Sequence, residues 1–81
     1  MPRLLAPNGT KNIIGNRIYE LRTKNKLSQE KLMAQLQLLG FDSERGVIKR
    51  IENGTRFVSD VEIKLFAQFF NVSYEYLLDK D

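Results

Sequence analysis

The chain has 81 residues, of which 42% are hydrophobic and 28% are charged, and its formal net charge is +3. These values predict one soluble globular domain and exclude the disordered and fibrous classes. Cysteine and histidine are both absent, which excludes disulfides, Ser-His and Cys-His nucleophile pairs and the ordinary zinc sites. We therefore expect no metal, no cofactor and no enzymatic activity. No apolar run approaches the roughly 20 residues of a membrane span, and a reducing cytoplasm suits a chain without cysteine.

Charge is distributed unevenly along the chain. Residues 1–56 contain 11 Lys and Arg against 5 Asp and Glu, whereas residues 57–81 contain 2 against 5. The basic first part predicts a face that meets a polyanion. From charge alone, an unevenly charged solvated surface is an equally good interpretation.

The first 24 residues divide into an arm and a helix. Residues 1–11 contain two prolines and a glycine without helical spacing, so we expect a flexible N-terminal arm followed by a folded domain over residues 12–81. Between Asn12 and Lys24, apolar residues recur at the spacing of one helical face. They are Ile14, Ile18 and Leu21.

Three serines predict the starts of three further helices. Each follows an apolar residue and precedes a second apolar residue by four positions, as in Leu27-Ser28 with Leu32. A serine in this position caps the first turn, and the apolar pair forms a hydrophobic staple. Helices are therefore expected to start near Ser28, Ser59 and Ser73, with Glu62 completing a capping box after Ser59.

The remaining pattern predicts a compact all-α fold of five helices. The second helix is expected to run from Ser28 to Leu39, to bury Leu32, Leu36 and Leu39, and to end at Gly40. A third helix over residues 44–53, with Ser43 as a possible cap, ends at Gly54. Its predicted buried side consists of Val47, Ile48 and Ile51. The fourth is expected to bury Ile63, Phe66, Phe69 and Phe70 to different extents, and the fifth is short.

The predicted third helix has a cationic outward face. Gly46, Lys49 and Asn53 lie opposite its apolar side, and Arg45 and Arg50 flank them. Arginine and lysine can donate to guanine O6 and N7, so this face matches a major groove of DNA. Two interpretations of Gly46 stay open: closer approach of a partner, or simple tolerance near the helix start.

Three stretches resemble a known family of regulators. They are Leu-Ser-Gln-Glu-Lys-Leu-Met-Ala-Gln-Leu from residue 27, Val-Ile-Lys-Arg-Ile-Glu-Asn-Gly from residue 47, and Val-Ser-Tyr-Glu-Tyr-Leu-Leu from residue 72. Over residues 12–78 the chain resembles the phage repressor and Cro type of helix-turn-helix domain, the xenobiotic-response-element family. The resemblance implies a bacterial or phage-encoded cytoplasmic regulator that binds double-stranded DNA, usually as a homodimeric repressor, with the third helix in the major groove.

The resemblance also assigns roles to residues. Base-facing positions would be Arg45, Gly46 and Arg50, with Glu44 and Lys49 nearby, and phosphate contacts would come from Ser28, Gln29, Asn53, Thr55 and Arg56. The sequence leaves two interpretations of Glu44 open: it serves the dipole of the helix's first turn, or it accepts a hydrogen bond from a cytosine amino group. Arg22 and Glu52 would form a mostly buried ion pair between the first and third helices. From their apolar character, Tyr74, Tyr76 and Leu78 are candidate dimer contacts, although Leu77 and Leu78 can equally close the core.

The chain departs from the family pattern in one respect, and one alternative function stays open. Between Leu36 and Ile48 the chain has about five residues more than the usual family spacing, so residues 37–43 lengthen the second helix, the connection, or both. The alternative function is a protein-interaction or antitoxin-like module on the same scaffold, with DNA binding secondary.

Overall fold

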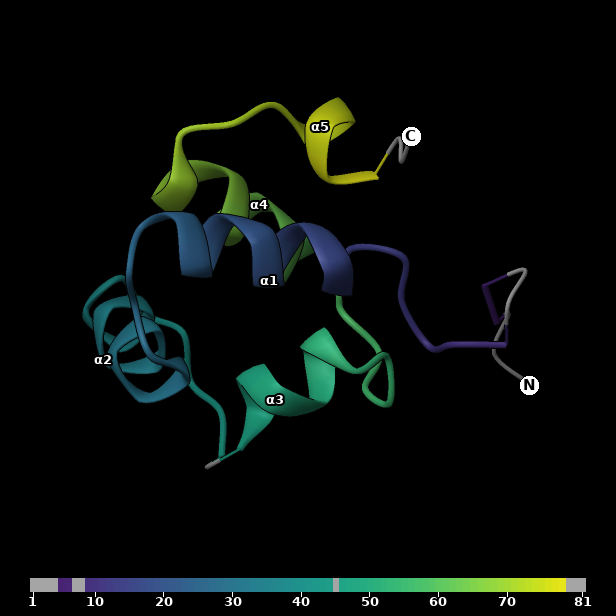
Figure 1. The fold of residues 1–81 in the computed structure, drawn as a ribbon, viewed down its shortest axis with the longest axis horizontal. Coiled ribbons are helices and arrows are strands. Elements are labelled where there is room, and N and C mark those ends of the chain that lie inside the picture. The colour runs from purple at the N-terminus through teal and green to yellow at the C-terminus, as the bar shows by residue number, and fades with distance from the viewer. Residues whose placement is uncertain (1–4, 7–8, 45, 79–81) are drawn as a thin grey trace.

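The computed structural model describes residues 5–6, 9–44 and 46–78, and this part of the chain is helical without a strand. Its five helices are α1 Gly15–Lys24, α2 Gln29–Leu38, α3 Val47–Glu52, α4 Asp60–Phe70 and α5 Tyr74–Leu78. In Figure 1, α1 crosses the middle of the domain, with α2 and α3 on one side of it and α4 and α5 on the other. The predicted all-α, five-helix fold is confirmed.

The three serine caps are confirmed. Ser28 Oγ accepts a hydrogen bond from Lys31 N at 3.0 Å, and Ser73 Oγ accepts one from Tyr76 N at 3.0 Å. At the start of α4, Ser59 Oγ accepts from Glu62 N, and Glu62 Oε1 accepts from Ser59 N, which completes the capping box. Each serine thus satisfies one N–H group that the first helical turn leaves without a backbone partner.

The core is assembled from apolar residues of the five helices, together with Ile14, which directly precedes α1, and Phe41, which lies in the connection after α2. Its buried hydrophobic residues are Ile14, Ile18, Leu21, Leu32, Leu36, Phe41, Val47, Ile48, Ile51, Phe66, Ala67 and Leu77. Ile63, Phe69 and Phe70 of α4 are only partly buried and pack against this cluster. The predicted buried stripes of α1 and α3 are therefore confirmed.

The end of α2 differs from the expectation. Leu39, predicted as buried, is 45% exposed, because α2 ends at Leu38 and the chain turns through Gly40. Phe41 N then donates to Leu36 O at 3.0 Å, which is the closing hydrogen bond of a Schellman motif. Phe41 enters the core in place of Leu39, with its ring 6.1 Å from that of Phe66. The extra residues of this region thus form a connection from Leu39 to Gly46.

The predicted bounds of the third helix, 44–53 with Ser43 as a cap, are wrong at the N-terminal end. α3 begins at Val47, and Gly46 precedes it with φ +80°. This left-handed backbone region is open to glycine and costly for residues with a side chain. Gly46 is therefore a turn residue and not part of the outward face of a helix, and Glu44 precedes the helix instead of lying in its first turn. Arg45 lies outside the described residues.

The N-terminal part also differs in detail. α1 begins at Gly15 and not at Asn12. Within the part of residues 1–11 that the structure describes, Ala6 N donates to Thr10 O at 2.8 Å. Lys11 N donates to Gly54 O, also at 2.8 Å. The second bond brings the segment before α1 against the loop that follows α3.

Candidate nucleic-acid interface

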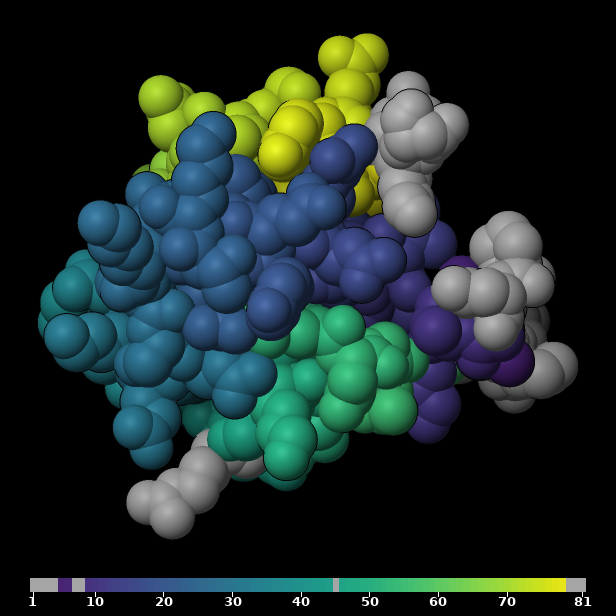
Figure 2. Space-filling view, viewed as in Figure 1, coloured from purple at the N-terminus to yellow at the C-terminus, as the bar shows by residue number. Residues whose placement is uncertain are grey.

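α3 presents one apolar and one polar side. Val47, Ile48 and Ile51 are at most 2% exposed, whereas Lys49 is exposed and Arg50 is partly exposed. Packing of the apolar side against the domain therefore leaves the side bearing the two cations at the surface. In the space-filling view, the chain around α3 forms the lower edge of the molecule (Figure 2).

The start of α1 holds the C-terminal end of α3. A Cβ atom on Gly15 would lie 2.5 Å from Ile51 O and 2.9 Å from Glu52 O, so only glycine fits at this approach. Asn12 Nδ2 donates to Ile51 O at 3.1 Å and to Arg56 O at 2.8 Å, while its Oδ1 accepts from Gly15 N at 2.9 Å. Sequence reasoning missed both residues. The available signal was the Asn-x-x-Gly spacing, which is that of a side-chain cap.

A buried ion pair joins α1 to the end of α3. Arg22 Nε lies 2.6 Å from Glu52 Oε2, and Arg22 Nη2 lies 3.1 Å from Glu52 Oε1. The two side chains are 11% and 7% exposed. Arg22 Nη1 also donates to Leu27 O at 2.7 Å. The hydrogen bond to Glu52 raises the pKa of Arg22 against the opposing effect of burial, so the guanidinium stays charged.

The start of α2 is tied to the same carboxylate. Gln29 Nε2 donates to Glu52 Oε1 at 3.0 Å, so three helices meet at this group. Gln29 was expected to contact phosphate. In the structure it is the first residue of α2, directly after the capping residue Ser28. Any contact that Gln29 makes with a ligand is therefore linked to the position of α3.

Three of the residues that were expected to contact phosphate lie in the loop after α3, and their surroundings differ. Asn53 and Thr55 are exposed and bonded to each other, with 2.7 Å between Thr55 Oγ1 and Asn53 Oδ1. Arg56 instead turns toward α4, where its Nη1 and Nη2 atoms lie 2.9 and 3.0 Å from the oxygens of Glu62.

The Arg56–Glu62 pair fixes this loop to the first turn of α4. Burial opposes ionisation of Glu62, but hydrogen bonds from Arg56 and from Ser59 outweigh it and lower the pKa of Glu62. The same contact raises the pKa of Arg56. Arg56 thus has a structural partner in the protein, which the sequence did not reveal.

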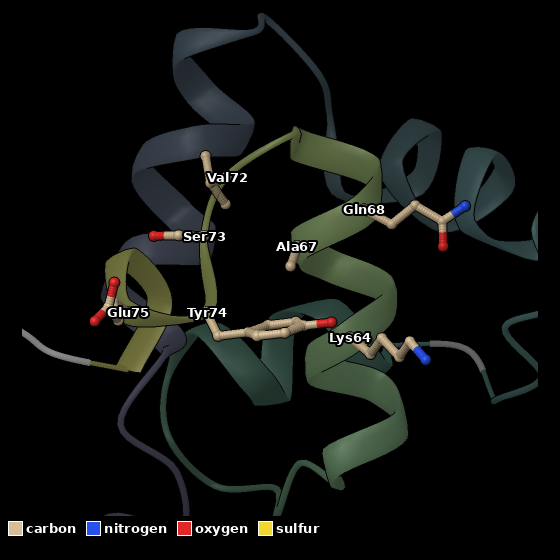
Figure 3. Close-up of a pocket in the computed structure, with 7 residues that line it drawn as sticks. All are labelled: Lys64, Ala67, Gln68, Val72, Ser73, Tyr74 and Glu75. Atoms are coloured by element: carbon tan, nitrogen blue, oxygen red, sulfur yellow. The ribbon is translucent and has the colours of Figure 1, made fainter.

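A second surface lies between α4 and α5, away from α3. It contains a groove of about 420 Å³ lined by Lys64, Ala67, Gln68, Val72, Ser73, Tyr74 and Glu75. In Figure 3, the side chain of Tyr74 extends toward Lys64 of α4. Of the candidate dimer contacts, Tyr74, Tyr76 and Leu78 are all exposed, and the Tyr76 ring lies 4.6 Å from the Arg17 guanidinium. Leu77 is fully buried and closes the core.

The described residues contain neither a metal-binding cluster nor a membrane-spanning helix. Among residues 5–6, 9–44 and 46–78, no three Asp or Glu side chains gather where a metal ion could be held. In the same part of the chain, no helix has the length and apolarity needed to cross a bilayer.

The arrangement of α2 and α3 defines the class of the protein. A short helix is anchored by its apolar side and C-terminal end, carries cations on its outer side, and follows a helix whose first residues, Gln29 and Glu30, line one groove together with Lys49. This is the helix-turn-helix class of DNA-binding domain.

The comparison with known families gives the same assignment. Residues 15–81 match the helix-turn-helix domain family, and the chain belongs to this family, in its repressor and Cro-type class. The resemblance seen in the sequence is thereby confirmed, and domains of this class are typically non-enzymatic DNA-binding regulators. No curated protein and no solved structure matches the chain.

Proposed function

We propose that the protein is a sequence-specific regulator of transcription, acting as a repressor, that inserts α3 into the major groove of DNA. The observation that carries this proposal is the cationic side of α3, where the exposed Lys49 lies opposite the buried stripe and the partly exposed Arg50 flanks it. Arg50 supplies base discrimination, and each good bidentate contact contributes about 1–3 kcal/mol against a wrong base. Lys49, Asn53 and Thr55 supply contacts to phosphate or base edges around it.

Selection of binding sites from random duplex DNA tests this proposal. The affinity for a selected duplex is then compared with that for a scrambled duplex at several salt concentrations. We expect a preference for the selected sequence that persists as salt rises, because base contacts depend less on counterion release than phosphate contacts do. Equal affinity at every salt would defeat the proposal and favour a protein-interaction module on the same scaffold.

A matched pair of lysine variants locates the contact. Lys49→Ala removes an exposed cation from α3, whereas Lys24→Ala removes one from the end of α1. We expect Lys49→Ala alone to weaken DNA binding and to reduce the salt slope by about 1, which is the change for one lost phosphate contact. Equal losses for both variants would mean that charge acts without a defined interface.

We also propose that the domain binds DNA as a homodimer that pairs through α4 and α5. Support comes from a second groove, of about 500 Å³, that adjoins the first and shares Lys64 and Tyr74 with it. Tyr74 is 51% exposed, and Val61 and Leu78 add apolar surface to the same groove. In a two-fold arrangement, Lys64 of each copy can pair with Glu75 of the other. α5 and α3 lie on opposite sides of α1 (Figure 1), so pairing leaves α3 open.

Sedimentation of the protein with and without its selected duplex tests the pairing. We expect two copies per duplex, on half-sites about 34 Å or a multiple of that apart. Tyr74→Glu should reduce pairing, whereas Leu38→Glu, which alters a highly exposed leucine on α2, should not. One copy per duplex for the unaltered protein would contradict the homodimer.

A further inference from the structure

We propose that Glu44 is a specificity-determining residue: its carboxylate holds the Arg50 guanidinium over the start of α3 and thereby suppresses binding to DNA of the wrong sequence. This inference rests on the proposed function, because it concerns how the same surface discriminates between sequences. It gives Glu44 a role different from a direct contact with a base.

Three residues come together at the N-terminal end of α3. Arg50 Nη2 lies 3.2 Å from Glu44 Oε2. A Cβ atom on Gly46 would lie 3.3 Å from Arg50 Nη1, so the guanidinium lies close over this glycine. The side chain of Arg50 therefore runs back toward the N-terminus of α3, which is the usual direction for long side chains on a helix. The guanidinium of Arg50 therefore lies against Glu44 and Gly46.

The exposure of this ion pair separates its role from stability. The side chains of Arg50 and Glu44 are 39% and 76% exposed. An ion pair in such surroundings typically contributes about 0–1 kcal/mol to folding, because water and salt screen it. The principal effect of Glu44 is therefore on where the guanidinium lies and on the charge beside it.

The effect of Glu44 on Arg50 differs between contacts to phosphate and contacts to a base. A phosphate can bind an arginine in almost any position and carries no sequence information. A carboxylate beside Arg50 repels phosphate and competes with it for the same N–H donors. A guanine offers two acceptors in a fixed arrangement, and the guanidinium has five N–H donors, so it can keep its bond to Glu44 and donate to the base. Glu44 thus weakens the non-specific contact more than the specific one.

The test uses Glu44→Gln, which removes the charge and keeps the shape of the side chain. Glu20→Gln is the matched control, because Glu20 forms an exposed ion pair with Arg17 on α1, at 3.4 Å, and its loss changes the net charge equally. Affinities for the selected duplex and for a scrambled duplex are measured by fluorescence anisotropy at several salt concentrations. The unfolding midpoint of each variant is measured in urea.

We expect Glu44→Gln to bind scrambled DNA roughly 3- to 10-fold more tightly near 0.1 M salt, the scale of one additional phosphate contact. Binding to the selected duplex should change less, so the ratio of the two affinities falls. Glu20→Gln should keep the ratio of the unaltered protein, and both variants should keep its unfolding midpoint.

Two results would overturn the inference. One is an unchanged ratio in Glu44→Gln. The other is weaker binding to the selected duplex with unchanged binding to scrambled DNA, which would make Glu44 a direct base contact. Failure of the proposed function itself looks different, because the unaltered protein would then show no preference for either duplex.

Discussion

The two ends of α3 differ sharply in how they are held. At the C-terminal end, Asn12 and Gly15 contact the last carbonyls of the helix, and Glu52 pairs with Arg22 at low exposure. At the N-terminal end, Gly46 offers no side-chain cap, and the ion pair found there is exposed. A helix of six residues has little stability of its own. Its position is therefore set from one end, and the other end is left accessible to a ligand.

The largest effect is expected from breaking the buried pair. Glu52→Ala leaves the Arg22 guanidinium buried without its carboxylate, and losing one partner of such a pair typically costs about 3–5 kcal/mol. The free energy of unfolding in urea measures this loss. Glu20→Ala, which breaks the exposed pair with Arg17, should cost less than about 1 kcal/mol. Similar costs for the two variants would remove the contrast between the ends of α3.

A second large effect is expected at the contact between α1 and α3. Gly15→Ala places a methyl group against two backbone carbonyls, which cannot move as a flexible side chain can. Overpacking of this kind typically costs about 1–3 kcal/mol. The neighbouring exposed Asn16 provides the control, since Asn16→Ala should leave the free energy of unfolding nearly unchanged. An unchanged free energy of unfolding in Gly15→Ala would show that the two helices can move apart without cost.

A smaller effect on the free energy of unfolding is expected when acid protonates Glu62, which holds the loop after α3. Because the folded state lowers the pKa of Glu62, this residue stabilises the protein above its ordinary pKa of about 4.5, and the contribution is lost as the pH falls through the lowered value. Unfolding of the unaltered protein and of Glu62→Gln is compared between about pH 7 and pH 3. The difference in their free energies of unfolding should shrink toward acid pH. A constant difference would contradict the role assigned to this carboxylate.

The smallest effect is expected at the open side of α3. Lys49→Ala should change the free energy of unfolding by less than about 0.5 kcal/mol, as is usual for exposed side chains. The same urea measurement checks it. A loss as large as that of Gly15→Ala would mean that Lys49 serves the fold, and its proposed role toward DNA would lose support.

The sequence predicted the local features of the fold well. Serine caps and apolar spacing act over one or two helical turns, so the starts of α2, α4 and α5 and the buried stripe of α3 could be predicted. Backbone geometry was less accessible: Gly46 was placed inside a helix because its left-handed φ angle leaves no mark in the apolar pattern. Phe41 was missed because its burial depends on how the chain turns after Leu38.

Contacts between distant residues account for the rest. Asn12 reaches Ile51 and Arg56, which lie 39 and 44 residues further along the chain. No spacing rule connects these positions. The family resemblance assigned Arg56 to phosphate, but the pairing of Arg56 with Glu62 depends on how the loop meets α4.

An NMR titration of the labelled protein with a duplex that carries a single selected half-site, to which one copy binds, tests most directly whether α3 contacts DNA. We expect the amide resonances of residues 46–55 and of the start of α2 to shift most, and those on the outer side of α4 and α5 to shift least. Largest shifts at Lys64, Tyr74 and Glu75, with little change around Lys49 and Arg50, would contradict it.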